Sequence, residues 1–261
     1  MIYQTPNKNS FAAMVEGSPA TSFILSLNVL FFFGTVVTGG STTQNLVDWG
    51  AKYGPYIAEG EIWRLFLPVL LHAGVFHLLA NTFGLLIFGS MVEKIYRTRN
   101  FVAVYVAAGV MGNVVSFLAG PNPGVGASGA VFGIVGAFAV YLLLNRRMLG
   151  QLGSQQLTSV GVIVFINIVF GLASPGIDNA AHFGGLLAGA LMAYFIAPRQ
   201  KLVQLESPFS FGPPRVMMQP ANVGTSRLVV ALVIIGLIAV AITWYESQTY
   251  VTNIFGNKIP G

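Results

Sequence analysis

Residues 181–197 read AHFGGLLAGALMAYFIA, a stretch that contains no Asp, Glu, Lys or Arg. At about 1.5 Å per residue, a helix of this length crosses most of the roughly 30 Å hydrocarbon core of a lipid bilayer. One imidazole, that of His182, interrupts an otherwise apolar run, and glycines follow it at helical spacing. The stretch therefore predicts a membrane-spanning helix with one strongly polar side chain inside it.

The same character extends over the whole chain. Of its 261 residues, 54% are hydrophobic and 8% are charged, whereas soluble domains carry about 25% charged residues. A water-soluble globule is thereby excluded, and an all-α membrane protein is expected. Seven apolar stretches approach the length of a membrane span. They cover residues 22–38, 66–92, 101–119, 128–145, 159–173, 181–197 and 228–245.

The basic residues orient these spans. The chain carries 13 Lys and Arg and a net charge of +5, which in a membrane protein does not indicate a nucleic-acid partner. With the N-terminus in the cytoplasm, ten basic residues lie inside and three outside, as the positive-inside rule requires. The inner ten are Lys8, Lys94, Arg97, Arg99, Arg146, Arg147, Arg199, Lys201, Arg215 and Arg227, and the outer three are Lys52, Arg64 and Lys258. We expect a bacterial inner-membrane protein with its N-terminus in the cytoplasm and its C-terminus outside.

Four segments are expected along the chain. A cytoplasmic N-terminal segment (1–21) precedes a six-span core (22–197), a proline-rich cytoplasmic linker (198–226) follows, and a seventh span with a short outer tail (227–261) comes last. The first span is interpreted as a retained helix rather than a signal peptide, because the residues before it have no excess of positive charge. Cysteine is absent, which excludes disulfides, thiol catalysis and thiolate metal sites.

Polar residues inside the predicted spans are the candidate functional residues. The chain has three histidines, His72, His77 and His182, and all fall within predicted spans. Asn81 follows His77 by one helical turn, and Ser128 opens the fourth span. His77, Ser128 and His182 each precede by 17 or 18 residues the basic residue that ends their span. At about 1.5 Å per residue this places all three at one depth.

A serine and a neutral histidine at one depth indicate nucleophilic catalysis. His182 can take the proton of the Ser128 hydroxyl, which is a poor nucleophile without a base. The backbone N–H of Ser128, the Asn81 amide and the His77 ring can supply donors to an oxyanion. Asp178 falls in the loop before the sixth span, so a Ser–His dyad is predicted rather than a triad.

Small residues explain how two helices would bring this dyad together. Gly129 and Gly133 on the fourth span, and Gly185 and Gly189 on the sixth, have the spacing that lets helix backbones approach closely in lipid. Phe132, one turn after Ser128, is predicted to stack on the His182 ring.

These motifs together resemble the rhomboid family of intramembrane serine proteases. The resemblance covers residues 22–197 and rests on Trp63-Arg64, His72 through Asn81, Gly126-Ala-Ser128-Gly129, and Ala181-His182-Phe-Gly-Gly185-Leu-Leu-Ala-Gly189. It implies a rhomboid-like six-helix core with one further helix. It also implies a peptide-bond hydrolase in which Ser128 is the nucleophile, His182 the base, and His77 with Asn81 the oxyanion hole.

Other residues of the resemblance are expected to have structural or supporting roles. Glu93 matches a structural acid of the family, although its sequence context near Lys94 and Arg97 favours a solvated or capping charge. His72 matches a structural or gating position, and we interpret it and Trp63-Arg64 as structural. The position of Phe132 is often Tyr in the family, so only its stacking is implied.

Competing functions were weighed against these residues. A zinc protease needs a His-Glu-x-x-His motif and an aspartyl intramembrane protease needs two buried Asp residues, and the sequence offers neither. Buried charges along a transport path are also lacking. The serious alternative is a rhomboid-like membrane chaperone that binds transmembrane helices without cleaving them. Loss of the serine or the histidine would indicate such a protein, and because both are present the sequence favours the enzyme. We expect cleavage of single-span substrates near the outer face, with no metal or other cofactor, whereas the sequence does not determine the natural substrate or the oligomeric state.

Overall fold

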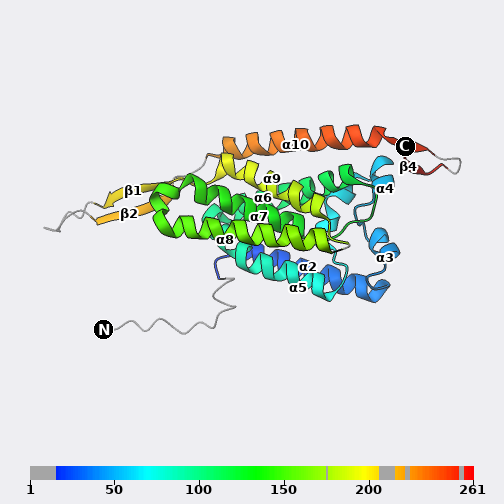
Figure 1. Ribbon diagram of the computed structural model, residues 1–261, viewed down its shortest axis with the longest axis horizontal. Helices are drawn as coiled ribbons and strands as arrows, with labels where there is room; N and C mark the ends of the chain where they lie inside the picture. Colours follow the sequence, from blue (N-terminus) through cyan, green and yellow to red (C-terminus); the bar gives the residue numbers. More distant parts are fainter. Residues whose placement is uncertain (1–15, 175, 206–214, 221–223, 253–255) are drawn as a thin grey trace.

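Long helices lie side by side along one axis and make up most of the molecule (Figure 1). The computed structural model describes residues 16–174, 176–205, 215–220, 224–252 and 256–261. The long helices are α2 (Pro19–Thr38), α5 (Val75–Gly84), α6 (Ser90–Ala119), α7 (Ser128–Leu144), α8 (Arg146–Ala173), α9 (Asn179–Ile196) and α10 (Thr225–Gln248). Most of predicted segment 1–21, with Lys8, lies outside the described residues.

These helices account for the apolar stretches of the sequence. Five helical segments of the described chain are long and apolar enough to cross a membrane, and α7 is a shorter apolar helix. One of the five, Val75–Ala119, is 45 residues long and comprises α5, the π-helix η3 (Leu85–Gly89) and α6. It is broken at Arg97, whose φ of 64° and ψ of 154° are not helical, so the predicted second and third spans are separate arms of one segment.

The prediction that the second span starts at residue 66 is wrong. Residues Leu67–Leu70 form the 3-10 helix η2, and α5 begins only at Val75, after Gly74 with its φ of 133°. Pro68 near the start of η2 cannot donate a backbone hydrogen bond, and Gly74 takes a left-handed conformation, so the chain turns before the span. His72 therefore lies in the connecting loop and not on the helix.

The fifth span is longer than predicted. Helix α8 begins at Arg146, bends at Gly150 (φ 56°, ψ −139°) and continues to Ala173. The polar residues Gln155, Gln156 and Thr158 lower the hydropathy of its first half. Hydropathy therefore predicts a span only in the second half of the helix. Along α8 only Gly153, Val160 and Gly171 are buried, so most of its apolar surface faces outward.

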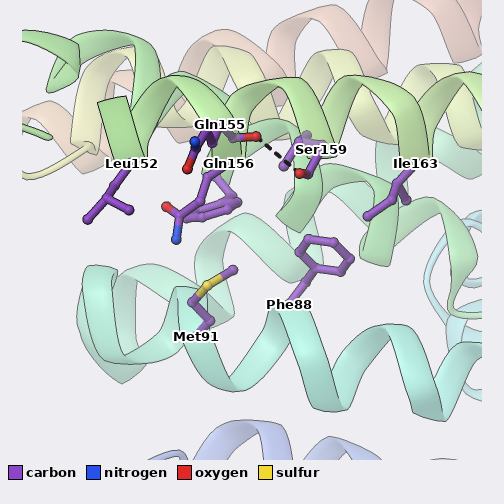
Figure 2. A pocket seen from close by; sticks show the side chains of 9 residues that line it. Phe88, Met91, Leu152, Gln155, Gln156, Ser159 and Ile163 are labelled. Atoms are coloured by element: carbon purple, nitrogen blue, oxygen red, sulfur yellow. Dashed lines mark hydrogen bonds between the residues drawn. The ribbon is translucent and has the colours of Figure 1, made fainter. Parts of the chain in front are cut away.

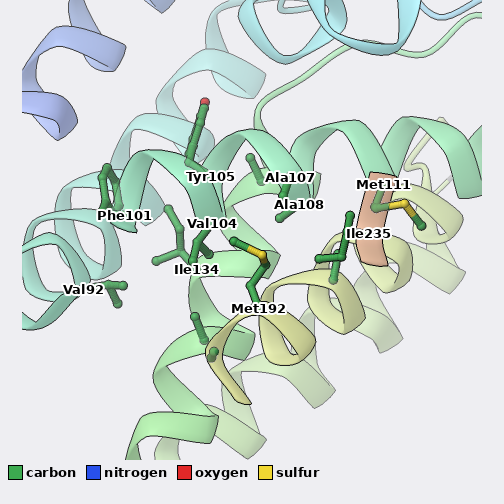
Figure 3. Packing of buried hydrophobic residues seen from close by; sticks show 14 of the residues in the cluster. Val92, Phe101, Val104, Tyr105, Ala107, Ala108, Met111, Ile134, Met192 and Ile235 are labelled. Carbon is green, nitrogen blue, oxygen red and sulfur yellow. The ribbon is translucent and has the colours of Figure 1, made fainter. Parts of the chain in front are cut away.

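The core lies among α6, α7 and α9. Figure 3 shows Val104 and Ala108 of α6 beside Ile134 of α7 and Met192 of α9, all fully buried. Helix α10 adds Ile235 to this cluster from one side. One buried polar contact crosses this core, since the hydroxyl of Tyr96 in α6 donates to the carbonyl of Ala137 in α7 at 2.8 Å.

Glu93 is buried, so of its two interpretations the solvated charge is wrong and the capping charge fits the structure. The side chain is 1% exposed. Its carboxylate accepts hydrogen bonds from the backbone N–H groups of Ala20 and Thr21 at 3.0 and 2.8 Å, and from the hydroxyls of Thr21 and Thr98, each at 2.8 Å. A carboxylate there satisfies N–H groups that have no partner within the first turn of α2. Glu93 thus joins the start of α2 to the break at Arg97.

Short elements cover one end of the bundle, which we call the α4 end. They are α3 (Thr43–Asp48), α4 (Gly54–Ala58), η1 (Ile62–Leu65), η2, and the antiparallel strands β3 (Tyr250–Thr252) and β4 (Lys258–Pro260) (Figure 1). Arg64 is buried among them, and its guanidinium donates to the carbonyls of Val47 and Ala51 at 2.6 and 3.2 Å and lies 4.7 Å from the Tyr56 ring centroid. Trp63, by contrast, is half exposed.

The C-terminal strands pack onto the same end. The Tyr250 ring lies 5.6 Å from that of Phe117, and its hydroxyl is so close to Gly54 that a Cβ there would overlap it. The backbone N–H of Lys258 donates to the Glu59 carboxylate at 3.2 Å. The tail after α10 therefore braces α4.

Strands β1 (Gln200–Leu205) and β2 (Arg215–Pro220) project from the opposite end of the bundle (Figure 1). They pair antiparallel, with Gln200 opposite Pro220 and Leu205 opposite Arg215. Residues 206–214, with Pro208, Pro213 and Pro214 of the predicted linker, lie outside the described residues.

Candidate active site

Ser128 and His182 are in contact at the α4 end of the bundle. Oγ of Ser128 lies 2.8 Å from Nε2 of His182. Ser128 is the first residue of α7, and the N-cap position belongs to Ala127, so the serine side chain does not cap the helix. His182 lies in the first turn of α9. The hydroxyl is therefore within hydrogen-bonding distance of a potential base.

Glycine permits this contact. A Cβ at Gly185 would overlap the carbonyl oxygen of Gly129, and one at Gly189 would overlap that of Gly133. Helices α7 and α9 thus touch backbone to backbone directly beside the serine and the histidine, as their small-residue spacing indicated.

The His182 ring is held by stacking on one side. Phe132 lies parallel to it, with ring centroids 4.4 Å apart and an interplanar angle of 10°. Nδ1 of His182 is buried and has no hydrogen-bond partner among the described residues. Asp178 directs its carboxylate to the Ala181 N–H and the Ser116 hydroxyl instead. Among the described residues, no carboxylate is therefore hydrogen-bonded to the His182 ring.

His77 borders the same space. The backbone N–H of Ala73 donates to its Nδ1 at 3.4 Å, so the neutral ring carries its proton on Nε2. A Cβ at Gly126 would lie 2.6 Å from that Nε2 and 3.7 Å from Oγ of Ser128. Glycine at position 126, with a φ of 127°, keeps this space open, and a potential N–H donor flanks it.

Asn81 and His72 both lie next to His77. The Asn81 amide donates to the backbone carbonyl of His77 at 2.9 Å, and no contact with Ser128 is seen among the described residues. His72 is fully buried, and its ring centroid lies 5.3 Å from that of His77 at an angle of 67°. His72 therefore packs against His77 from the loop before α5.

Sequence reasoning missed a polar cluster beside the site. The sequence places Lys52 outside and Asp178 in a loop, and Ser116 is not among the predicted site residues, yet all three line one cavity of about 270 Å³. The signal available in the sequence was the N-cap position of Asp178, three residues before Ala181 and at the start of an apolar run. No group of three or more His, Asp or Glu suited to a metal ion occurs in the described part of the chain.

A second cavity lies on the side of the bundle. It measures about 260 Å³ and separates α8 from the segment of η3 and α6 (Figure 2). Phe88 and Met91 form one wall, and Gln155, Gln156 and Ser159 line the other. It does not include the Ser128–His182 pair.

The apolar helices define a class of protein, a multi-pass integral membrane protein, and a serine and a histidine are in contact at one end of its bundle. The chain belongs to the rhomboid family, since the Rhomboid domain matches residues 59–199. The resemblance drawn from the motifs and the all-α fold are both confirmed.

Curated relatives agree with this membership. The chain is 42% identical over 189 residues to "Rhomboid protease GluP" of Bacillus subtilis, covering 71% of this chain and 36% of that protein. It is 29% identical over 207 residues to "Putative rhomboid protease YdcA" of the same organism, covering 77% of this chain and 98% of that protein. "Rhomboid-like protease 1" of Toxoplasma gondii is 36% identical over 147 residues, covering 55% of this chain and 50% of that protein. The chain thus spans about a third of GluP and nearly all of YdcA.

Proposed function

We propose that this protein is an intramembrane serine endopeptidase that cleaves transmembrane substrates with Ser128 as nucleophile and His182 as base. The observation that carries the proposal is the 2.8 Å contact between Ser128 Oγ and His182 Nε2. Relatives named as rhomboid proteases support it.

The reaction follows from this contact. Oγ of Ser128 attacks the scissile carbonyl carbon while Nε2 of His182 accepts the hydroxyl proton. The tetrahedral intermediate collapses when the imidazolium returns that proton to the leaving amine, which leaves an acyl ester on Ser128. Water, deprotonated by His182, then hydrolyses the ester and regenerates the serine.

Three donors are proposed for the oxyanion. The Ser128 N–H is free of helical hydrogen bonds because it belongs to the first turn of α7. Nε2–H of His77 borders the space above Ser128, and Asn81 lies one turn further along α5. Because one Asn81 N–H bonds the His77 carbonyl, Asn81 also fixes the backbone from which His77 projects. Phe132 keeps the His182 ring in plane.

The proposed topology puts this chemistry near the outer face of a bacterial inner membrane. The excess of basic residues assigns the N-terminus to the cytoplasm and the C-terminus to the outside. The loop that leads into Ser128 lies beside α4, because the carbonyl of Pro121 accepts the N–H of Gly54, and the β3–β4 tail lies at this same end (Figure 1). A helical substrate hides its carbonyls, so the scissile segment must unwind. Single-span substrates with small or helix-breaking residues are therefore expected.

Co-expression with a panel of tagged single-span proteins tests the proposal. The wild-type protein is expected to cleave at least one of them, Ser128→Ala none, and Ser154→Ala, an exposed serine of α8, as many as wild type. Cleavage that survives in Ser128→Ala would overturn the mechanism. Binding of uncut substrate by the wild-type protein would favour the non-proteolytic alternative instead.

A further inference from the structure

Asp178 connects the helix that carries His182 to its surroundings. Its Oδ1 accepts the Ala181 N–H at 2.9 Å as the N-cap of α9. Its backbone carbonyl accepts the N–H of His182 itself at 3.1 Å. Through these two bonds, Asp178 fixes the turn of α9 from which the proposed base projects.

The other carboxylate oxygen reaches a different helix. Oδ2 of Asp178 accepts the hydroxyl of Ser116 in α6, which is 62 residues distant in sequence. One carboxylate thus caps α9 and joins it to α6, so a shift of α9 along or around its axis would break the bond to Ser116.

Lys52 completes the cluster from the loop before α4. It is 3% exposed, and its ammonium donates to the carbonyls of Ser116 and Gly120 at 3.2 and 3.1 Å. Gly124 separates it from Asp178, since a Cβ there would lie 3.3 Å from Oδ2 of Asp178 and 3.3 Å from Cε of Lys52. The buried positive charge therefore stands opposite the capping carboxylate. Burial lowers the pKa of Lys52 from 10.5 to about 8, against the attraction of Asp178, which raises it.

We infer that Asp178 is a positioning residue, which sets the place of His182 relative to Ser128 by tying the first turn of α9 to Ser116, with Lys52 balancing its charge. The inference rests on the proposed function. Its physical basis is that Nδ1 of His182 has no partner among the described residues, so no third group of the site orients the ring by a hydrogen bond. The orientation depends on the Phe132 stack and on the position of the helix backbone.

Kinetics in detergent with a cleaved substrate test this inference. In Asp178→Ala we expect kcat to fall about ten- to hundred-fold with KM nearly unchanged, since a misplacement near 1 Å costs about that much. Asp178→Asn keeps an N-cap oxygen and should recover most of kcat. Ser116→Ala should lose less than Asp178→Ala, and Asp48→Ala, an exposed acid in α3, should match wild type.

The outcomes separate the inference from the proposed function. Residual activity of Asp178→Ala that Ser128→Ala abolishes, with kcat lowered and KM kept, supports the inference. An unchanged kcat in Asp178→Ala, or equal losses in the Ala and Asn variants, would overturn it while leaving the dyad intact. If Asp178→Ala does not fold, the kcat of the double variant Asp178→Asn/Ser116→Ala is compared with that of each single variant. A loss equal to the product of the single losses would then contradict coupling between the two residues.

Discussion

Gly185 of α9 lies directly against the carbonyl oxygen of Gly129 in α7, and no side chain can stand between the two helices at that point. The residue after Ser128 thus touches the residue three places beyond His182. The closeness of the two proposed catalytic side chains is therefore a property of backbone packing.

Gly185→Ala should destabilise the protein and reduce cleavage together, because the added methyl group forces α7 and α9 apart. Overpacking of this kind costs about 1–3 kcal/mol. Thermal unfolding in detergent measures the first effect and substrate cleavage the second. Gly161→Ala, in α8 with nothing within 4 Å of the new methyl, is the matched control and should lower neither stability nor cleavage, since Ala favours a helix more than Gly does. Wild-type stability in Gly185→Ala would contradict the packing described.

Ser128→Ala and His182→Ala should each reduce cleavage to background while the thermal stability stays near that of wild type. The double variant should lose no more than either single variant, because the two groups act as one unit. A serine-directed phosphonate should label the wild-type protein at Ser128 and fail to label His182→Ala at a comparable rate. If His182→Ala is labelled at the wild-type rate, His182 is not the base that activates Ser128.

Asn81→Ala should lower kcat by about 10²-fold, near the lower end of the effect of losing one oxyanion donor. KM should change little, because the ground-state carbonyl is not yet an oxyanion. The comparison is with His77→Ala, whose Nε2 borders the site more closely and whose loss should be larger. If Asn81→Ala instead lowers stability and leaves kcat intact, its role is confined to the bond with the His77 carbonyl.

Glu93→Ala should destabilise the protein by about 3 kcal/mol or more. It leaves the N–H groups of Ala20 and Thr21 buried without partners, and each such group costs about 1–3 kcal/mol. Thr98→Ala removes one of the four hydrogen bonds and should cost about 1 kcal/mol. Chemical unfolding in mixed micelles measures both. Equal, small effects would mean that water replaces the carboxylate.

The stability of the folded state should rise with pH between about 8 and 10.5 through Lys52. Its pKa is about 8 when folded and 10.5 when exposed, so in this window the unfolded chain binds more protons than the folded one, and the free energy of unfolding increases with pH. The slope of Tm against pH should therefore be more positive in wild type than in Lys52→Met. All other titratable groups are common to the two proteins, so identical slopes would contradict a role of Lys52 in the pH dependence.

The helices were predictable from sequence because hydropathy responds to the length of an apolar run. The same signal says nothing about which side chains face each other, which explains the errors at Glu93 and His72. Glu93 stands among charged residues in sequence, but its partners are at residues 20, 21 and 98. The turn before α5 depends on Pro68 and Gly74, and their effect is hidden inside an apolar stretch.

The pairing of Ser128 with His182 could be predicted from sequence, because parallel helices with three polar residues at one depth can pack in only a few ways that bury those residues together. The network of Lys52, Ser116 and Asp178 was not, since its members come from a loop, a helix end and a cap that are far apart in sequence. Charged residues in loops are usually solvated, and only the folded structure shows that Lys52 is buried.

The brace of the C-terminal tail on α4 has a consequence for biosynthesis. Lys258 and Glu59 are 199 residues apart, and ribosomes add about 5–20 residues per second. The loop around Gly54 and both helices of the dyad are therefore synthesised long before Tyr250 reaches them. During membrane insertion the α4 end stays unbraced for roughly 10–40 s at that rate. The contacts that brace the α4 end therefore form only after α10 and the strands that follow it have been synthesised.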